Sequence, residues 1–575
     1  MNFINDMIDK YLNKSPWRDI YKERGIDYKI KIPEVSAYEY LRQQNENNMD
    51  SVAVNYFNKK MTFRYFFGEI NLCARALKSS GIRPGDVVSI CMANTPEAVI
   101  AFYACNKIGA IANMIHPLSA EEEIKQSLIS TKSVLLITID LTYSKVKNVI
   151  DETNVYKAII VSPGDSMPLL LKIGYNVTSV RKIEQFHKSE AFMSWSDFMA
   201  RGKTYSTNVL VKTTPDTPAV IMHSGGTTGV PKNIVLTNKN INSMVVQVHA
   251  ILPDITEKDS MLVILPLFHV FGLIVCVHCP LCLGSSVILV PRFDAKRFDK
   301  LFSDYHPTMI AGVPTLFEAL LSNTHMKKMD LSYLHIILSG GDTLSVAKHE
   351  LVNTFFEEHG SKAKVLQGYG MTETSGCVTF GAEPGSLGIP FPGNEIKIVD
   401  PNTREELPPD TVGEMCICGP VVSPGYLDND KETNIAFEKD KKGKIWVHTG
   451  DLGRITEDKI IYFVQRLKRM LIVSGYNVYP SHIEEVLLNH PDVLNVGVIG
   501  IPHPYKVQVP KAFIVLKSGI KPTPLVKKNI KDYCEKNLAK YMIPKEFVFR
   551  ESLPKTMVGK VNYRELEEEE NTTDE

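Results

Sequence analysis

The 575-residue sequence has no excess of charge of either sign, because 65 Lys and Arg residues balance 65 Asp and Glu residues. This balance gives no indication of a nucleic-acid-binding surface, which would need a basic patch. The first residues lack a basic segment followed by an apolar core, so we expect no secretory signal. Ten scattered cysteines in a chain of this size favour reduced thiols in a cytoplasmic protein over a disulfide scaffold.

Charged residues are also absent from one long stretch, residues 261–291, which is long enough to span a bilayer. Pro266, Pro280 and Gly284 interrupt it, so we favour a strand, a loop, a buried helix and a second strand over a membrane span. Peripheral membrane contact and the oligomeric state stay open. Three cysteines here have a spacing that would suit an iron–sulfur cluster only with a fourth ligand, and we interpret them as small apolar residues. They are Cys276, Cys279 and Cys282.

Apolar runs alternate with helical patterns in the first 400 residues. Residues 87–92 and 110–113 predict strands on either side of a helix that Pro96 opens. A similar alternation returns from residue 262 to about 367, so we expect parallel, doubly wound sheets and an α/β fold class. After Asp400, frequent Pro and Gly residues between short β-prone runs predict a small β-barrel.

A separate C-terminal unit is expected to begin at about Arg466, which divides the chain into domains at 1–465 and 466–575. In this unit Ser481 and Glu484 have the spacing of a capping box at the start of a helix. The acidic residues 567–570 predict the beginning of a disordered, solubilising tail.

A glycine-rich turn between two β-prone runs, residues 219–222 and 234–236, organises the sequence. Its glycines allow backbone N–H groups to point inward, a shape suited to phosphate oxygens, while hydroxyls and a lysine add donors and positive charge. The P-loop of NTPases needs Gly-Lys-Ser/Thr running directly into a helix, which this turn lacks. A flexible polar turn is the remaining alternative. The candidate phosphate-binding residues are Ser224, Gly225, Gly226, Thr227, Thr228, Gly229 and Lys232.

This turn resembles the phosphate-binding signature of the adenylate-forming (AMP-binding) superfamily, and the chain is most similar to its bacterial long-chain fatty acyl-CoA synthetases. Further motifs follow in the family's order, which argues against coincidence. They are residues 265–269, 339–342, 367–373, 446–451 with 466–468, and 554–560. The run 473–480 is also similar to that of the fatty acyl-CoA synthetases.

The resemblance implies a large N-terminal domain of two doubly wound sheets plus a small β-barrel, with a small, mobile α+β C-terminal domain. It implies an ATP-dependent acyl-CoA synthetase that uses ATP, Mg²⁺ and coenzyme A and acts on a small-molecule carboxylic acid, preferably a fatty acid. The acid would attack ATP to give an acyl-adenylate and diphosphate, and CoA would then displace AMP. The alternatives are an acyl-AMP ligase that loads a carrier protein, an aryl- or bile-acid CoA ligase, and a catalytically silent binding protein.

The resemblance also assigns roles to individual residues. Lys560 would bridge the substrate carboxylate and the α-phosphate, Thr372 would donate to that phosphate, and His269 would lie beside the acyl pocket. Glu373 and Ser224 would hold Mg²⁺. The other nucleotide- and CoA-binding candidates are Gly341, Asp342, Gln367, Gly368, Tyr369, Gly370, Met371, Asp451, Arg466, Ser474, Gly475 and Tyr476.

Each of these residues has an ordinary structural alternative when it is taken singly. Tyr369 could be a core aromatic residue, Asp451 a turn residue and Lys560 a surface lysine. The chain also departs from the family at Arg469, which replaces an acidic residue common after the hinge lysine, Lys468. We therefore expect Arg466, Lys468 and Arg469 to form a basic cluster at the domain junction.

Overall fold

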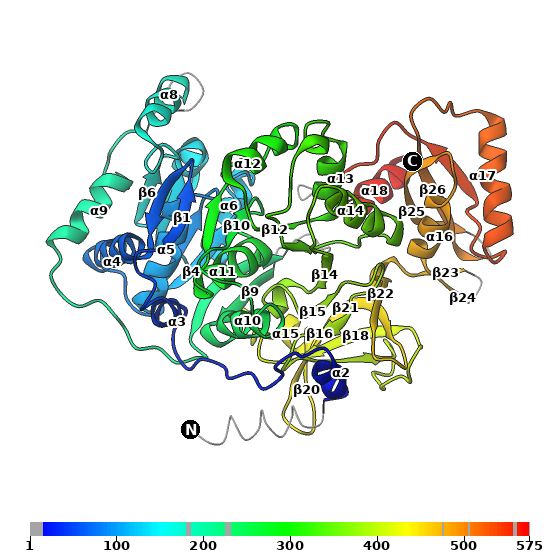
Figure 1. The fold of residues 1–575 in the computed structure, drawn as a ribbon, viewed down its shortest axis with the longest axis horizontal. Coiled ribbons are helices and arrows are strands. Elements are labelled where there is room, and N and C mark those ends of the chain that lie inside the picture. Colours follow the sequence, from blue (N-terminus) through cyan, green and yellow to red (C-terminus); the bar gives the residue numbers. More distant parts are fainter. Residues whose placement is uncertain are drawn as a thin grey trace. The chain divides into compact units, whose positions relative to one another are not determined.

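The computed structural model describes residues 15–179, 184, 186–224, 232–473, 476–503, 506–555 and 561–573. The chain forms two compact units, each described here by itself. The first contains the residues up to Ile396 together with Ile417–Val447, and the second contains Lys397–Cys416 together with His448–Glu575. Figure 1 shows most of the first unit in blue to yellow-green and most of the second in orange and red.

The first sheet of the first unit has a parallel centre and antiparallel edges. Strands β1, β11, β10, β12, β13 and β14 pair in parallel, while β2 at one edge and β15 and β16 at the other are antiparallel. The strand bounds are Val52–Tyr56 (β1), Lys59–Thr62 (β2), Ser260–Val263 (β10), Ser286–Leu289 (β11), Met309–Gly312 (β12), Ile336–Ser339 (β13), Val365–Tyr369 (β14), Thr379–Gly381 (β15) and Ile389–Pro390 (β16).

The second sheet of this unit has the order β19-β9-β8-β4-β3-β5-β6-β7, and its pairs from β8 to β7 are parallel. Strands β8 and β9 form an antiparallel hairpin, and β19 adds to the free edge of β9. The bounds are Val87–Cys91 (β3), Ile111–Ile115 (β4), Leu135–Ile139 (β5), Lys157–Val161 (β6), Phe192–Ser194 (β7), Pro218–Ser224 (β8), Lys232–Thr237 (β9) and Gly425–Tyr426 (β19). These two sheets confirm the predicted α/β fold.

The helices of the first unit pack on the sheets through apolar faces, as in α4, where Phe66, Ile70 and Leu77 are buried. Their bounds are Arg18–Glu23 (α2), Ala37–Gln44 (α3), Phe63–Ser79 (α4), Pro96–Lys107 (α5), Glu121–Ser130 (α6), Tyr143–Val149 (α7), Leu169–Ser179 (α8), Trp195–Thr204 (α9), Asn238–Ile251 (α10), Cys279–Cys282 (α11), Phe298–Tyr305 (α12), Pro314–Ser322 (α13), Val346–Glu358 (α14) and Asp430–Ala436 (α15). Short turns of 3-10 helix are Asp140–Thr142 (η1), Ile150–Glu152 (η2), Ala295–Arg297 (η4), Met326–Lys328 (η5) and Thr372–Thr374 (η6).

The uncharged stretch 261–291 folds as expected, because β10 and β11 enclose a buried helix made of the π-helical η3 (Phe271–His278) and α11. A Cβ atom on Gly272 would lie 2.1 Å from the carbonyl oxygen of Pro266, so only glycine allows this close turn. Its three cysteines are buried, and burial raises the pKa of the Cys276 thiol. In the part of the chain that is described, no helix has both the length and the apolar character to cross a membrane.

The chain passes between the units in strands β17, β18 and β21 of a third sheet, where the β-barrel was expected. This sheet has the order β17-β18-β21-β20, with β22 beside β21. The bounds are Glu395–Val399 (β17), Gly413–Cys418 (β18), Phe437–Lys439 (β20), Ile445–Ile455 (β21) and Ile461–Arg466 (β22).

The second unit adds a fourth sheet, in which β26 of the long hairpin β25–β26 also pairs with β23 and with β27, and β24 pairs with β23. Helices α16 and α17 contribute Ile483, Leu487 and Ile530 to its core. The bounds are Leu467–Arg469 (η7), Leu471–Val473 (β23), Tyr476–Val478 (β24), Pro480–Leu488 (α16), Val493–His503 (β25), Val507–Leu516 (β26), Pro524–Asn537 (α17), Glu546–Phe549 (β27) and Tyr563–Thr573 (α18).

Two predictions for this unit are wrong. The acidic segment 567–570 is helical, in α18, because Leu566 is buried and Glu570 pairs with Lys511 at 2.5 Å. The capping box of Ser481 and Glu484 does not form, because α16 begins at Pro480 and its cap has no side-chain hydrogen bond. Glu484 instead accepts hydrogen bonds from the side chain of Arg469 and the N–H of Val498.

Candidate active site

Strands β8 and β9 hold the two described ends of the glycine-rich turn. Ser224 ends β8 and lies opposite Lys232, the first residue of β9. The half-buried His223, just before the turn, contacts Asn113 and Ser127, and desolvation of its ring lowers its pKa to about 4. The other turn candidates lie outside the described residues. They are Gly225, Gly226, Thr227, Thr228 and Gly229.

The side chain of Lys232 belongs to a network of charged and aromatic groups. Its Nζ lies 2.6 Å from Glu432 Oε2 and 4.7 Å from the centre of the Tyr426 ring. The Tyr426 hydroxyl donates a hydrogen bond of 3.0 Å to Oε1 of Glu373. Tyr426 therefore connects the lysine beside the turn to the carboxylate expected to hold Mg²⁺, and burial followed by the Glu373 charge raises the pKa of Tyr426.

The backbone that carries Glu373 is held by Ser423, which lies just before β19 and also bonds to β9. The N–H of Ser423 donates to the carbonyl of Glu373 at 2.8 Å, and the Ser423 hydroxyl donates to the carbonyl of Val235 at 2.6 Å. Glu373 itself is buried within η6, next to the half-buried Thr372. The structure therefore brings Lys232, Thr372 and Glu373 to one place at the ends of strands from both sheets.

The two predicted adenine-binding segments follow neighbouring parallel strands. Strand β13 leads to Gly341 and the exposed Asp342, while β14 contains Gln367, Gly368 and Tyr369. The carboxyl ends of parallel strands form the usual ligand-binding edge of such sheets. After β14 the chain turns closely on itself, because a Cβ atom on Gly370 would lie 2.2 Å from the carbonyl oxygen of Gly376. Met371 completes the turn by donating its N–H to Thr374.

His269 is exposed on the loop after β10, and its Nδ1 accepts the N–H of Phe271 at 3.4 Å. Asn94 holds this loop, because its side chain donates to the carbonyl of Leu265 and accepts from the N–H of Leu267. The adjacent Phe268 stacks on His116, with ring centres 4.0 Å apart.

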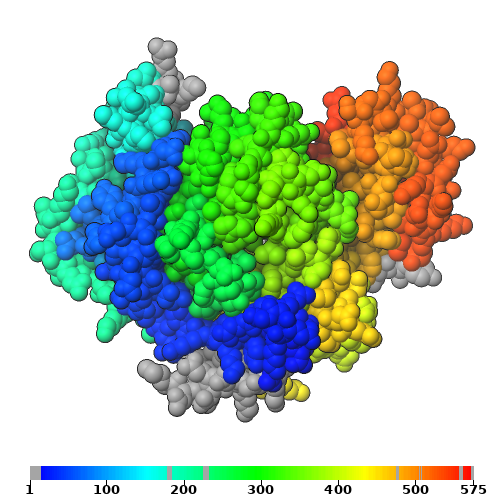
Figure 2. All heavy atoms as spheres, viewed as in Figure 1, coloured from blue at the N-terminus to red at the C-terminus, as the bar shows by residue number. Residues whose placement is uncertain are grey.

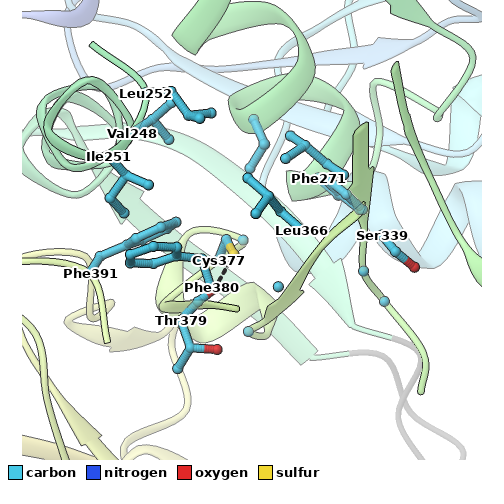
Figure 3. A pocket seen from close by; sticks show the side chains of 17 residues that line it. Val248, Ile251, Leu252, Phe271, Ser339, Leu366, Cys377, Thr379, Phe380 and Phe391 are labelled. Carbon is cyan, nitrogen blue, oxygen red and sulfur yellow. Dashed lines mark hydrogen bonds between the residues drawn. The ribbon is translucent and has the colours of Figure 1, made fainter. Parts of the chain in front are cut away.

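An apolar pocket lies at the edge of the first sheet, between α10, η3 and β13–β16 (Figure 3). Its volume is about 60 Å³. At 10–15 Å³ per water this space holds on the order of four to six waters. A long alkyl chain would therefore enter only if side chains turned aside.

Phe271 and Val275 of η3 line the pocket, whereas His269 does not. The other large lining side chains are Val248, Ile251, Leu252, Leu338, Leu366, Phe380 and Phe391.

In the second unit, Asp451 lies on β21 directly opposite Arg466 on β22. The buried Asp451 carboxylate forms an ion pair of 2.9 Å between its Oδ1 and Nε of Arg466. Gly450 precedes it with a φ of +66°, a left-handed conformation that favours glycine. The two predicted ribose-binding residues are therefore cross-strand neighbours.

The turn before Asp451 is held by a carboxylate that the sequence analysis missed. Glu414 accepts the N–H of Gly450 at 2.9 Å through Oε1 and bonds His448 Nδ1 at 2.9 Å through Oε2. Glu414 and His448 also lie close to Cys416. In the described part of the chain, these three side chains are the one group that could together hold a metal ion. Sulfur and imidazole donors would suit a thiophilic ion rather than Mg²⁺.

The predicted basic cluster is wrong for one of its three members. Arg469 turns into the second unit, where its guanidinium lies 2.6 Å from Glu484 and 3.6 Å from the centre of the Tyr563 ring. Lys468 is exposed in η7. Arg469 is thus neutralised by a carboxylate that the sequence analysis had assigned to a helix cap.

Several candidates in the second unit lie in segments that the structure does not describe or describes only in part. Ser474, Gly475 and Lys560 lie outside the described residues, and only the backbone of Tyr476 is described, in β24. The segment that contains Lys560 is bounded by a bridge between Lys555 and Val561.

Tyr426 and Glu432 are the other residues that the sequence analysis missed. They follow a turn rich in Pro and Gly, and their contacts are with residues far away in the sequence. The one available signal was an aromatic residue after Pro424 and Gly425 at the expected end of the N-terminal domain.

The sequence profile of the AMP-binding enzyme family matches residues 41–427. This chain belongs to the AMP-binding enzyme family. The profile of the AMP-binding enzyme C-terminal domain matches residues 482–560. The residues of the Lys232 network fall within the first match apart from Glu432, and Lys560 is the last residue of the second.

Relatives in this family cover nearly the whole chain. A long-chain-fatty-acid–CoA ligase of Bacillus subtilis is 31% identical over 565 residues, which cover 97% of this chain and 98% of that protein. The 4-coumarate–CoA ligase 2 of Nicotiana tabacum is 29% identical over 568 residues, with coverage of 95% and 97%. ATP-bound MatB from Rhodopseudomonas palustris has the same fold, with a TM-score of 0.80, 22% identity and coverage of 93% and 99%. Because the two ligases are named for different acids, similarity alone does not select a substrate.

Proposed function

We propose that this AMP-binding enzyme is an ATP-dependent acid–CoA ligase and that its acid is a fatty acid. The observation that carries the ligase assignment is the Lys232–Tyr426–Glu373 network at the end of the β8–β9 hairpin. It brings a lysine, which can bind phosphate, and a carboxylate, which can bind Mg²⁺, to the side of a glycine-rich turn. Adenylation crowds negative charges together, and fixed positive charge lowers the barrier to such a step.

In this proposal, the turn from Ser224 to Gly229 and Lys232 hold the β- and γ-phosphates of ATP. Glu373 and the Ser224 hydroxyl offer the oxygen ligands that Mg²⁺ prefers, and the bound ion would neutralise phosphate charge. Tyr369 stacks on adenine, with Gly341, Asp342, Gln367, Gly368, Gly370 and Met371 forming the adjacent backbone. The buried Asp451 accepts from the ribose hydroxyls, with Arg466 fixing its orientation. Thr372 and Lys560 donate to the α-phosphate region.

The apolar lining of the pocket supports a fatty acid, whose alkyl chain would enter as lining side chains turn aside. The large lining side chains are aliphatic or aromatic, and each buried CH₂ of a bound chain contributes roughly 0.8 kcal/mol. Long-chain-fatty-acid–CoA ligases of Bacillus subtilis and Escherichia coli are 31% and 30% identical to this chain. An aryl acid is the second candidate, because the Nicotiana tabacum 4-coumarate–CoA ligase is 29% identical.

The decisive experiment measures kcat/KM for CoA thioester formation with acetate, octanoate, palmitate, benzoate and 4-coumarate. We expect octanoate or palmitate to exceed the other acids by orders of magnitude. A preference for benzoate or 4-coumarate would end the fatty-acid assignment, and diphosphate release without a CoA thioester would favour carrier-protein loading.

Lys560→Ala should lose most adenylation, at a cost of about 3–4 kcal/mol, whereas Lys555→Ala should not.

We also propose that the domain boundary lies at 465/466 and that the chain turns at Lys468 between the two half-reactions, with Ser474, Gly475 and Tyr476 near CoA. Lys468 is exposed in η7, a single turn of 3-10 helix between β22 and β23. Lys468→Pro should therefore impair thioester formation from preformed acyl-adenylate more than adenylation, because proline fixes φ. Lys468→Ala, which keeps backbone freedom, is the matched control. Equal rates in the Pro and Ala variants would remove Lys468 as the hinge.

A further inference from the structure

Three side chains of the kinds that bind metals converge where the neighbouring strands β18 and β21 meet in the second unit. Oε2 of Glu414 lies 2.9 Å from Nδ1 of His448, and Sγ of Cys416 lies 3.3 Å from the same nitrogen. Ligand atoms of the three residues all lie within 4.8 Å of one another. A carboxylate, a thiol and an imidazole therefore share one position, which the nucleotide contacts proposed above do not use.

The geometry of the sheet explains why these side chains meet. Glu414 and Cys416 are two positions apart on β18, so their side chains project from the same face of the sheet. His448 lies on the adjacent β21, and the hydroxyl of the next residue, Thr449, donates to the carbonyl of Met415 at 2.7 Å. Strand pairing, rather than a loop, therefore holds the three side chains together.

The cluster is almost completely buried. The side chains of Glu414 and His448 have exposed fractions of 9% and 8%, and Cys416 is fully buried. The strands that carry them are drawn in yellow tones in Figure 1, and Figure 2 shows atoms of this colour on the molecular surface. Burial lowers the local dielectric constant, which strengthens the attraction between a carboxylate and a bound cation.

Hydrogen bonds alone do not make both contacts of the imidazole favourable. If Nδ1 of His448 carries a proton, it donates to Glu414 and cannot accept the S–H of Cys416. If Nδ1 carries no proton, it accepts from Cys416 and gives the carboxylate no donor. A cation among the three atoms would make each of them a ligand. Oε1 of Glu414 would keep its bond to the N–H of Gly450.

We propose that Glu414, Cys416 and His448 form a binding site for a thiophilic divalent ion, Zn²⁺, with water as the fourth ligand. Tetrahedral Zn²⁺ places its sulfur, nitrogen and oxygen ligands roughly 3.4–3.6 Å apart. The observed separations of 2.9 and 3.3 Å need to open by only about 0.3–0.5 Å. The thiol proton leaves to solvent when the ion binds. The site is independent of the Mg²⁺ proposed at Glu373 and of the acid that the enzyme uses.

The test is equilibrium dialysis of the metal-free, full-length protein against Zn²⁺ in the presence of a competing chelator. We expect the unaltered protein to bind Zn²⁺, and Cys416→Ser and His448→Gln each to weaken binding at least about tenfold. With Co²⁺ as a spectroscopic probe, the unaltered protein should show a thiolate-to-metal charge-transfer band that Cys416→Ser abolishes. The matched control is Cys534→Ser, which changes a buried cysteine in the apolar core of the same unit and should keep both signals.

Three results would overturn the proposal. They are no Zn²⁺ binding by the unaltered protein, displacement of the bound Zn²⁺ by an excess of Mg²⁺, and equal affinities of Cys416→Ser and Cys534→Ser. Thermal unfolding gives a second measurement, because an ion that binds only the folded state raises the melting temperature. Zn²⁺ should raise it in the unaltered protein and in Cys534→Ser but not in Cys416→Ser. If Cys416→Ser does not fold, His448→Gln provides the same comparison.

Discussion

Two carboxylates of the candidate site are held in different ways. Asp451 pairs with Arg466 on the adjacent antiparallel strand, so this ion pair forms within a single hairpin of the second unit. Glu373 is held in the first unit by Tyr426, which lies 53 positions later, and Tyr426 also contacts Lys232. The first arrangement is local, whereas the second depends on how separate strands assemble. Substitutions in the two arrangements should therefore have different consequences.

The largest expected effect comes from breaking the arrangement around Glu373. Glu373→Gln removes a buried negative charge that we place at the Mg²⁺ and phosphate site. Loss of one such electrostatic group typically lowers kcat by about 10²–10³-fold. ATP–pyrophosphate exchange measures this step. Glu432→Gln, which alters the half-exposed partner of Lys232, is the control, and the same loss in both variants would contradict a special role for Glu373.

A third buried carboxylate, Glu97, shows how burial changes the pKa of a carboxyl group apart from the effect of an ion pair. Its side chain accepts a hydrogen bond from the hydroxyl of Ser166, and burial raises its pKa to about 7 from 4.5. The folded state thus holds a proton that the unfolded state has lost, so stability is full below pH 4.5 and declines as pH rises through about 7. A shift of this size corresponds to on the order of 3 kcal/mol.

Glu97→Gln should remove this decline while keeping the contact with Ser166. Urea unfolding at pH 5 and pH 8, followed by tryptophan fluorescence, compares the variant with the unaltered protein. The exposed Glu46→Gln serves as control. Parallel pH profiles for the unaltered protein and Glu97→Gln would show that Glu97 is charged in the folded state.

Asp451→Asn tests the local arrangement. Hydrogen bonds to a charged group are worth about 1.5–3 kcal/mol, so we expect KM for ATP to rise about 10–100-fold with a smaller change in kcat. Asp410→Asn breaks the exposed pair of Asp410 with Arg454 in the same unit and should leave KM unchanged. An unchanged KM in Asp451→Asn would remove the proposed ribose contact.

The smallest effect is expected for Tyr426→Phe. This variant refines the comparison between the arrangements around Asp451 and Glu373. It keeps the ring beside Lys232 and removes only the hydroxyl that donates to Glu373. A single hydrogen bond contributes roughly 1 kcal/mol, so adenylation should fall about fivefold. Tyr462→Phe, at a ring that contacts Arg454, is the control. A loss as large as that in Glu373→Gln would mean that the hydroxyl itself contacts substrate.

Sequence reasoning worked where the signal is local. The strands β3 and β4, the helix opened by Pro96 and the buried helix within 261–291 were all predicted from apolar periodicity and turn residues. Sequence reasoning failed where a contact with a residue far away in the sequence determines the local structure. Glu484 has the spacing of a cap but pairs with Arg469, and the acidic residues after Leu566 form a helix because basic residues of other elements pair with them.

The sequence by itself determined the order of the motifs, the α/β class and the candidates Ser224, Lys232, Thr372, Glu373, Asp451 and Lys560. Those features depend on residue types at fixed spacing, which can be read directly from the sequence. Only the tertiary structure decided that Tyr426 joins Lys232 to Glu373 and that Glu414 holds the turn before Asp451. The physical reason is that side-chain contacts and burial depend on which elements pack together, and residue spacing along the chain carries little information about that.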